Sequence, residues 1–225
     1  ELYRIKGGQE ALKKLAEEQF DMVVTIMRIG DMDPFTFGRK VKEISPGMPV
    51  VILAYNTPEL ARLLEIYDEK AIDRIFIWHG DGGILTGIIQ YIEDMKNAEK
   101  DTSLIGVQNI LVIEDSISSY SRYIHILFEE LWDQTALLLQ DSLTWTEKSL
   151  RQRARPRVHL ALSFEEAIRI YEKIKGNLMA VISERSFTRN GVMDNNGGLD
   201  FITMIRKEFP HVPVLLQSNN QEDEE

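Results

Sequence analysis

An internal repeat limits the folds open to this chain more than any other feature of its 225 residues. Residues 37–56 and 201–220 align without a gap, and each stretch follows a helix-like segment and a short apolar run. Five positions are identical in the two copies: Phe37, Pro46, Pro49, Val50 and Asn56 match Phe201, Pro210, Pro213, Val214 and Asn220. Self-similarity of this kind predicts two modules of the same architecture, one after the other.

Both modules are expected to belong to the α/β class. Six short apolar runs read as strands covered on both faces: residues 23–27, 49–53, 74–78, 109–113, 179–183 and 213–217. Segments with a helical period alternate with them, at residues 11–20, 35–44, 58–68, 85–96, 164–175 and 199–209. This alternation predicts doubly wound parallel sheets in three layers. Measured against the repeat, the first module lacks its first strand and the second lacks its last, so both are expected to be truncated.

A polar linker is expected over residues 99–108, which makes residues 1–98 and 109–225 the two domains. One segment of the second domain has no counterpart in the first. Between residues 116 and 155, apolar side chains recur as on one face of a long helix, and basic residues follow them. This pattern predicts an unusually long first helix. The alternative is an interaction arm that binds a partner or a second copy of the chain.

Composition argues against several classes of function. The formal net charge is −10, which disfavours a protein built on contacts with nucleic-acid phosphates. The chain has no cysteine, so disulfides and thiolate chemistry are excluded and a reducing cytoplasm suits it. No apolar run approaches the roughly 18 residues of a membrane span. A cytoplasmic protein that binds neither nucleic acid nor membrane is therefore expected.

Two adjacent carboxylates, Glu114 and Asp115, follow the strand at residues 109–113. In an open parallel sheet, ligand sites form at the carboxyl ends of strands, and carboxylates there suit Mg²⁺. The two residues are therefore candidates for a metal site. The alternative is that they cap the following helix, since acidic side chains are favoured at helix N-termini.

The order of these motifs resembles the receiver domains of two-component response regulators, which have the flavodoxin-like fold. In the second module, NILVIEDS, MAVISE and PVLLQSNN resemble the first, third and fourth receiver strands. In the first module, FDMVV, GDMDPF and MPVVIL resemble the third and fourth. The chain is thus similar to a tandem of receivers. Its insertion is similar to that in the N-terminal regulatory region of large bacterial phosphoenolpyruvate synthase or pyruvate phosphate dikinase-like proteins.

The resemblance implies roles for residues of the second module. Glu114 and Asp115 stand at the positions of the acidic pair that holds Mg²⁺, and the backbone carbonyl of Ser186 at that of a further metal ligand. Glu184 stands at the position of the phosphoryl-accepting Asp, and Ser218 at that of the switch hydroxyl. Together with Glu184, the metal ligands would form a weak Mg²⁺ site.

Glu184 departs from the family because its carboxylate lies one methylene further out than that of Asp. Phosphoryl transfer depends on in-line positioning, so the longer side chain would enter the space of the phosphoryl group. Three interpretations stay open: a fixed negative charge that resembles the phosphorylated state, a metal ligand, or an inert remnant.

The first module departs further from the family pattern. With the GDMDPF motif fixing the register, the acceptor position falls on Ile26, the switch position on Ala54 and the position of the family's Lys on Trp78. These side chains can neither accept, sense nor neutralise a phosphoryl group, so the first module is expected to be a degenerate pseudo-receiver. Asp31 and Asp33 are expected to be loop residues and a helix N-cap.

Three weaker candidates are interpreted as structural. The glycine-rich run that begins at His79 is expected to be a turn, because it lacks the Lys of a phosphate-binding loop. His125 is expected to be an ordinary helix residue and not a phosphotransfer histidine. The loop that begins at Gly191 is rich in Asn and Gly, which favour turns.

The resemblance therefore implies a bacterial, cytoplasmic signalling module without enzyme activity. Tandem receivers would act in a phosphorelay or as a phosphorylation-independent protein-interaction switch. The partner would be a histidine kinase or an output domain, or a second copy in a homodimer. The alternative is the regulatory part of a phosphoenolpyruvate synthase-like enzyme whose catalytic domains are absent from this chain.

Overall fold

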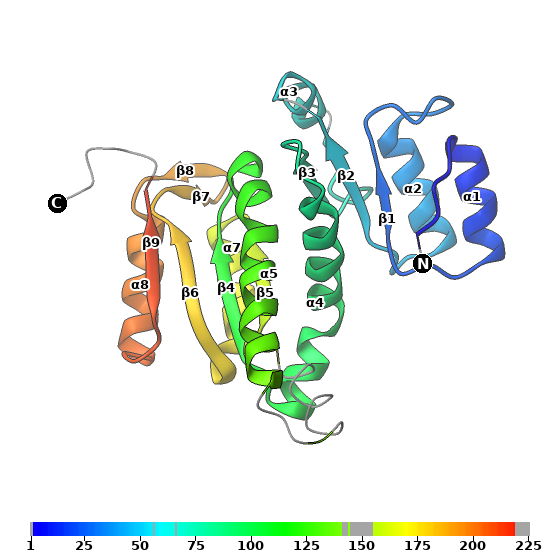
Figure 1. Ribbon diagram of the computed structural model, residues 1–225. Coiled ribbons are helices and arrows are strands. Elements are labelled where there is room, and N and C mark those ends of the chain that lie inside the picture. The colour runs from blue at the N-terminus through cyan, green and yellow to red at the C-terminus, as the bar shows by residue number, and fades with distance from the viewer. Residues whose placement is uncertain (1, 56, 66, 141–143, 145–154, 219–225) are drawn as a thin grey trace. The chain divides into compact units, whose positions relative to one another are not determined.

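The structure is a computed structural model that describes residues 2–55, 57–65, 67–140, 144 and 155–218. The chain divides into two compact units, Glu1–Ile84 and Leu85–Glu225. Each unit combines helices with a parallel sheet (Figure 1). The α/β class predicted from alternating apolar runs and helical segments is therefore confirmed.

The first unit contains a three-stranded parallel sheet in the order β1-β2-β3. The strands are β1 (Val23–Thr25), β2 (Val50–Ala54) and β3 (Arg74–Ile77), and the helices are α1 (Gly8–Glu17), α2 (Pro34–Ile44) and α3 (Thr57–Glu65). Every residue of β2 is buried, as expected of a central strand that is covered on both faces.

Two aspartates in the loop after β1 stabilise helix starts in this unit. Asp33 is the N-cap of α2, and its carboxylate accepts hydrogen bonds from two first-turn N–H groups at 3.1 and 2.9 Å. Asp31 accepts from the N–H groups of Gly8 and Gln9 at 2.7 and 3.0 Å, so it satisfies donors at the start of α1. The loop and capping roles predicted for this pair are confirmed. The carboxylates supply hydrogen-bond acceptors for backbone N–H groups that have no partner within the helix.

The second unit contains a four-stranded parallel sheet in the order β5-β4-β6-β9 and an antiparallel hairpin, β7-β8. The strands are β4 (Asn109–Ile113), β5 (Arg157–Ala161), β6 (Leu178–Glu184), β7 (Phe187–Arg189), β8 (Val192–Asp194) and β9 (Val214–Gln217). The helices are α4 (Gly83–Ile105), α5 (Ile117–Gln140), α7 (Phe164–Ile174) and α8 (Gly197–Glu208), with a short 3-10 turn, η1 (Lys175–Asn177). The strand order equals the first four strands of the flavodoxin-like order 2-1-3-4-5.

Helices cover both faces of this sheet, with α5 in front of it and α7 behind it in Figure 1. One face buries a cluster that β4, β5 and β6 share with α7, α8 and β7: Leu111, Ile113, Ala161, Ala167, Tyr171, Ile174, Leu178, Val181, Phe187, Phe201 and Ile205. Toward the sheet, α5 buries Tyr120, Ile124 and Phe128, each at most 1% exposed. Spacings of four residues place these three side chains on one face of the helix.

The long helix expected after β4 is α5, which runs for 24 residues. Residues 141–143 and 145–154, where the predicted segment continues, lie outside the described residues. None of the described helices has both the length and the apolarity that crossing a membrane requires.

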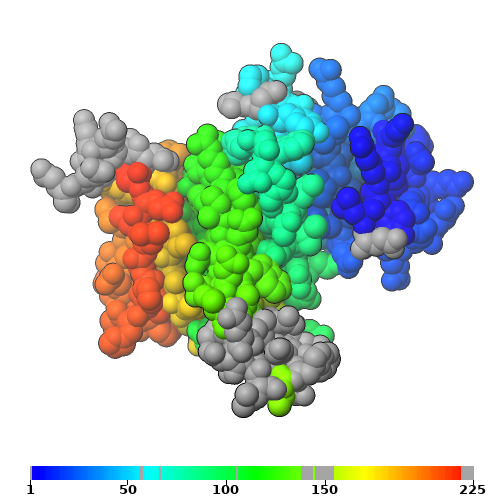
Figure 2. Space-filling model, in the orientation of Figure 1, coloured from blue at the N-terminus to red at the C-terminus, as the bar shows by residue number. Residues whose placement is uncertain are grey.

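The outermost strand of the second sheet, β9, keeps part of its surface in solvent. Leu215 and Leu216 are 55% and 37% exposed, and Figure 2 shows this strand in red at the surface. A strand at the edge of a sheet offers unpaired backbone groups to any further strand.

The predicted domain boundary needs a correction, because the linker expected at residues 99–108 does not separate the two units. Residues 99–105 continue α4, and the chain divides after Ile84 instead. The polar composition that suggested a linker reflects an exposed helix face and an ion pair, because Asp101 binds the Arg157 guanidinium at 2.8 and 3.0 Å. α4 therefore belongs with the second unit almost entirely, although the sequence had assigned residues 1–98 to the first domain.

A buried ion pair joins α4 to the start of β5. Asp94 is 0% exposed and accepts two hydrogen bonds from the Arg155 guanidinium, at 2.7 and 2.9 Å. The same carboxylate accepts a third from the N–H of Val158 at 2.8 Å. Arg155 also lies over the rings of Phe128 and Trp132, 5.4 and 5.8 Å from their centroids. A guanidinium buried this deeply depends on its counter-ion.

Asp94→Asn is expected to lower the free energy of unfolding by about 3–5 kcal/mol, because it leaves the Arg155 charge buried without its counter-ion. The measurement is the urea unfolding of the full chain. Glu93→Gln removes a charge from the adjacent, exposed position of α4 and should change stability by less than about 0.5 kcal/mol. Equal stability of the Asp94→Asn chain and the parent would contradict this role.

Candidate functional site

The acidic residues predicted from the sequence meet at the carboxyl edge of the second sheet. β4 and β6 are parallel neighbours in which Ile113 lies opposite Ser183, so the next residues, Glu114 and Glu184, lie side by side. The strand order reverses between these two strands, and doubly wound sheets form their binding crevice at that point. Ser218 directly follows β9 at the same edge and is exposed.

Glu114 and Glu184 form a buried carboxyl pair. They are 1% and 7% exposed, and their carboxyl groups are hydrogen-bonded to each other. Such a bond needs a proton between the two oxygens, which Glu114 carries below its raised pKa. Burial is the main cause that raises the pKa of Glu114 to about 7, and the neighbouring charges of Glu184 and Asp115 act in the same direction. The N–H of Ser116, which donates to Glu114 at 2.9 Å, opposes them.

Tyr123, on α5, brings a hydroxyl to the acidic pair. The hydroxyl is buried and has no hydrogen-bond partner among the described residues. Burial, followed by the charges of Glu114 and Glu184, raises the pKa of the phenol, so the hydroxyl keeps its proton and is a donor. Sequence reasoning missed this residue. Its place in the second turn of the helix that follows the acidic pair is a signal that could have found it.

Asp115 binds the hairpin. Its Oδ2 accepts hydrogen bonds from the backbone N–H and the hydroxyl of Thr188 in β7, both at 2.8 Å. Ser186 lies between β6 and β7, and its hydroxyl donates to the carbonyl of Asn195 at 3.3 Å. The structure thus brings Glu114 and Glu184 into contact, while it occupies the carboxylate of Asp115 with a different partner.

In the described part of the chain, no group of three or more His, Cys, Asp or Glu side chains is arranged to hold a metal ion. The donor chemistry still suits Mg²⁺, because Glu114, Asp115 and Glu184 supply carboxylate oxygens at one edge. A cation bound to Oδ2 of Asp115 would compete with Thr188 for that oxygen. The Mg²⁺ site that the resemblance implies, with the carbonyl of Ser186 as a further ligand, stays a prediction.

A glycine allows α8 to begin against the end of β6. A Cβ at Gly198 would lie 2.2 Å from the carbonyl oxygen of Glu184 and 3.0 Å from Cα of Arg185, which no side chain tolerates. The N–H of Gly198 donates to the carbonyl of Arg185 at 2.9 Å. The start of α8 therefore fixes the backbone that carries Glu184.

The carboxyl edge of the first sheet carries apolar side chains instead. Ile26 follows β1, Ala54 ends β2 and Trp78 follows β3. Ile26 and Trp78 are 37% and 38% exposed, and the Trp78 ring lies 5.6 Å from that of Tyr55. The three residues to which the resemblance assigns the positions of acceptor, switch hydroxyl and Lys thus stand at strand ends, and their side chains carry no carboxylate, hydroxyl or ammonium group.

Two weaker candidates are explained by local structure. The glycine-rich run after Trp78 forms a turn, in which Asp81 accepts a hydrogen bond from the N–H of Gly83 at 2.8 Å. His125 is half-buried on α5 where this helix packs closely on α4, since a Cβ at Gly87 would lie 3.0 Å from Cα of His125.

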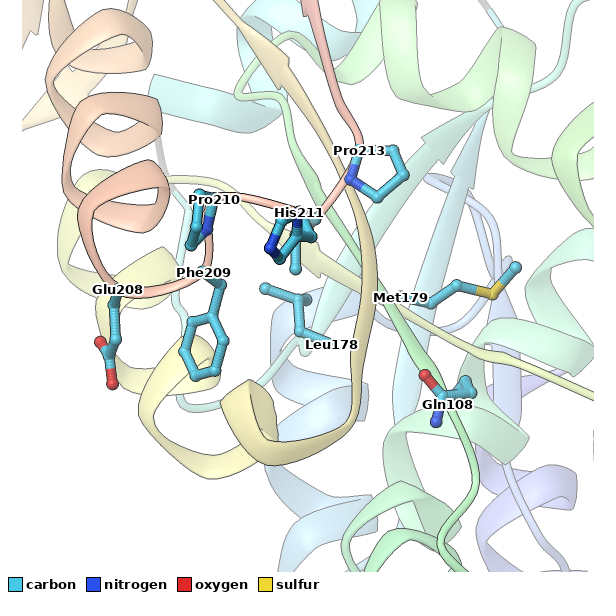
Figure 3. A pocket seen from close by; sticks show the side chains of 9 residues that line it. Gln108, Leu178, Met179, Glu208, Phe209, Pro210, His211 and Pro213 are labelled. Carbon is cyan, nitrogen blue, oxygen red and sulfur yellow. The ribbon is translucent and has the colours of Figure 1, made fainter.

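A separate hollow of about 370 Å³ lies at the opposite, amino-terminal edge of the second sheet (Figure 3). Its lining is mostly apolar and consists of Gln108, Leu178, Met179, Glu208, Phe209, Pro210, His211, Val212 and Pro213. The carboxylate of Glu208 already accepts a hydrogen bond from the Tyr171 hydroxyl at 2.8 Å. The acidic edge is therefore the stronger candidate for a functional site.

No family model matches the chain. A stretch of 56 residues, 24% of the chain, is 34% identical to part of the transcriptional regulatory protein ZraR of Escherichia coli strain K12. The match covers 13% of that protein, so the chain spans only a small part of the length of this curated relative.

The raised pKa of Glu114 predicts that stability falls as the pH rises. The folded chain keeps this proton up to about pH 7, whereas the unfolded chain loses it near the ordinary pKa of 4.5. Between these values the folded state binds more protons, so the free energy of unfolding decreases from about pH 4.5 to about pH 7. Above pH 7 the loss amounts to roughly 3 kcal/mol.

Glu114→Gln is expected to remove this loss, because an amide stays neutral and still donates to Glu184. Urea unfolding at pH 5 and pH 8 measures the effect. Glu129→Gln, at an exposed position of α5, should keep the pH dependence of the parent chain. A Glu114→Gln chain with the parent's pH dependence would refute the assignment.

Proposed function

We propose that the chain is a signal-transduction regulatory module whose second unit is receiver-like and acts by protein contact without accepting a phosphoryl group. The observation that carries the proposal is the pair Glu114–Glu184 at the switch point of a sheet with flavodoxin-like strand order. Similarity to a transcriptional regulatory protein over 24% of the chain supports a regulatory role.

The state of Glu184 argues against phosphoryl transfer. This residue holds the acceptor position, yet it is 7% exposed and hydrogen-bonded to Glu114. A carboxyl group that shares a proton is a poor nucleophile, and its extra methylene moves the oxygens away from the in-line geometry that transfer requires. In this proposal the pair stays unphosphorylated and forms a permanent part of the surface that a partner protein contacts.

The first unit serves as a pseudo-receiver in this proposal. Ile26, Ala54 and Trp78 give its carboxyl edge an apolar character, and the exposed rings of Trp78 and Tyr55 suit a protein partner. Aromatic side chains are enriched in protein interfaces. A histidine kinase or an output domain is the class of partner that a receiver tandem contacts.

Shortening the acceptor tests the proposal directly. With acetyl phosphate and Mg²⁺, the parent chain is expected to give no phosphorylated product in intact-mass spectrometry. In a longer form of the protein that includes the last receiver strand and its Lys, Glu184→Asp is expected to be labelled at that position, because the shorter side chain leaves Glu114 and makes room for the phosphoryl group. Glu165→Asp deletes a methylene at an exposed position of α7 and should stay unlabelled.

Two outcomes would contradict the proposal. Labelling of the parent chain would show that Glu184 accepts phosphoryl groups after all. A folded Glu184→Asp variant of the longer form that remains unlabelled would show that the edge is not a receiver site.

Mg²⁺ is expected to bind weakly at the acidic edge of the second unit and not at the edge of the first. In NMR titrations, the amide signals near Asp115 should shift saturably, and Asp115→Ala should abolish the shifts. The amides of Ile26, Ala54 and Trp78 should not respond to Mg²⁺, with or without beryllofluoride. Responses at these three residues would contradict the pseudo-receiver assignment.

A further inference from the structure

We infer that the β7–β8 hairpin is a strap latched to the acidic edge by Asp115, and that releasing Asp115 from Thr188 loosens the hairpin. The contacts that hold the strap do not depend on the proposed function, whereas a role of the strap in signalling rests on it.

The hairpin is too short to be stable alone. It contains three pairs, Phe187 with Asp194, Thr188 with Met193 and Arg189 with Val192. Its two-residue turn has positive φ at both positions, 51° at Asn190 and 75° at Gly191, which matches the tight turns of β-hairpins. An isolated two-stranded hairpin is marginally stable in water, so its position depends on anchors.

One group of anchors holds the hairpin to the helices behind the sheet. Phe187 is 0% exposed and stacks on Phe164 with centroids 6.2 Å apart. The guanidinium of Arg189 lies 4.0 Å from the centre of the Phe164 ring and binds Asp194 and Asp200 at 3.3 and 3.1 Å. The ion pair with Asp194 lies within the hairpin, and the one with Asp200 is substantially exposed and therefore weak, so Phe187 is the principal anchor of this group.

Asp115 supplies the anchor on the side of the acidic edge. Its Oδ2 accepts both the N–H and the hydroxyl of Thr188 at 2.8 Å, across 73 positions of the chain. Hydrogen bonds to an ionised carboxylate are about twice as strong as neutral ones. The latch thus ties the end of β4 to the middle of β7.

The exposed strand of the hairpin, β8, lies directly across the ladder from the latch residue Thr188. Met193 pairs with Thr188 across the ladder, and Val192 and Met193 are 69% and 56% exposed. A cation that ligates Oδ2 of Asp115 competes with Thr188 for that oxygen. A cation at this oxygen would therefore couple occupation of the acidic edge to the position of the apolar tip formed by Val192 and Met193.

Amide hydrogen exchange of the full chain tests the strap. Asp115→Ala is expected to accelerate exchange at residues 187–194 by about tenfold, since it removes two charge-assisted hydrogen bonds. Thr188→Val keeps the N–H and the side-chain volume but deletes the hydroxyl, so it should accelerate the same amides to a smaller extent. Asp133→Ala, at an exposed position of α5, should leave them unchanged.

Peptides from β4 and β6 serve as the internal reference. If Asp115→Ala accelerates them as much as the hairpin, the chain is unfolding globally, and Thr188→Val then decides. Parent-like exchange of residues 187–194 in Thr188→Val, together with no hairpin-specific change in Asp115→Ala, refutes the strap.

Hydrogen exchange in the presence of Mg²⁺ tests the coupling to a cation independently of the strap itself. Addition of Mg²⁺ to the parent chain should accelerate the hairpin amides, and Asp115→Ala should remove this response. If the variants loosen the hairpin but Mg²⁺ has no effect, the strap stands and the coupling to a cation fails. The outcome of the phosphodonor experiment with Glu184→Asp bears on neither result.

Discussion

The parallel pairing of β4 with β6 is the constraint on which the functional interpretation of the second unit depends. Because Ile113 lies opposite Ser183, the two glutamates that follow share one buried position at the edge of the sheet. The shared proton and the electrostatic environment of Tyr123 follow from that placement. A slip by one residue would place Ser183 or Arg185 beside Glu114, and none of this chemistry would exist. The close packing of Gly198 on the backbone of Glu184 and Arg185 opposes such a slip.

The two units differ in chemistry at the carboxyl edges of their sheets. The second unit has carboxylates there, and burial raises the pKa of Glu114 to about 7. Ionising this buried carboxyl group above that pH costs folding free energy. The first unit has apolar side chains at Ile26, Ala54 and Trp78, which carry no such penalty. Perturbed ionisable groups concentrate at functional sites. The asymmetry therefore favours the second unit as the part that responds to a ligand and the first as a passive surface.

The elements that the sequence predicted well are those set by local pattern. Continuous β-branched runs identified β2 and β4, and Asp33 was identified as an N-cap from its place before a helical period. The polar side chains of residues 99–105 favour a loop when the sequence is considered alone, because the partner that fixes Asp101 in the helix, Arg157, is 56 positions away. The hairpin was predicted only as a loop, although Asn190-Gly191 between short runs is a known hairpin signal.

Part of the candidate site could be predicted because the strand assignment fixes which residues lie at strand ends. Parallel strands bring their ends to one edge, so the proximity of Glu114 and Glu184 follows from the strand assignment alone. Which carboxylate bonds which donor depends on side-chain rotamers and on β7, whose position is fixed by Phe187. The interaction of Asp115 with Thr188 across 73 positions therefore had no signature in the sequence.

The buried pair of Asp94 and Arg155 defines where this protein can be divided. The two residues are 61 positions apart, and the apparent linker at residues 99–108 lies between them. A gene fusion with its breakpoint in that linker would transfer the second sheet without its counter-ion and leave a guanidinium stranded in the interior. Recombination that preserves a folded second unit must therefore carry α4 with it, from upstream of Asp94, as part of one inherited piece.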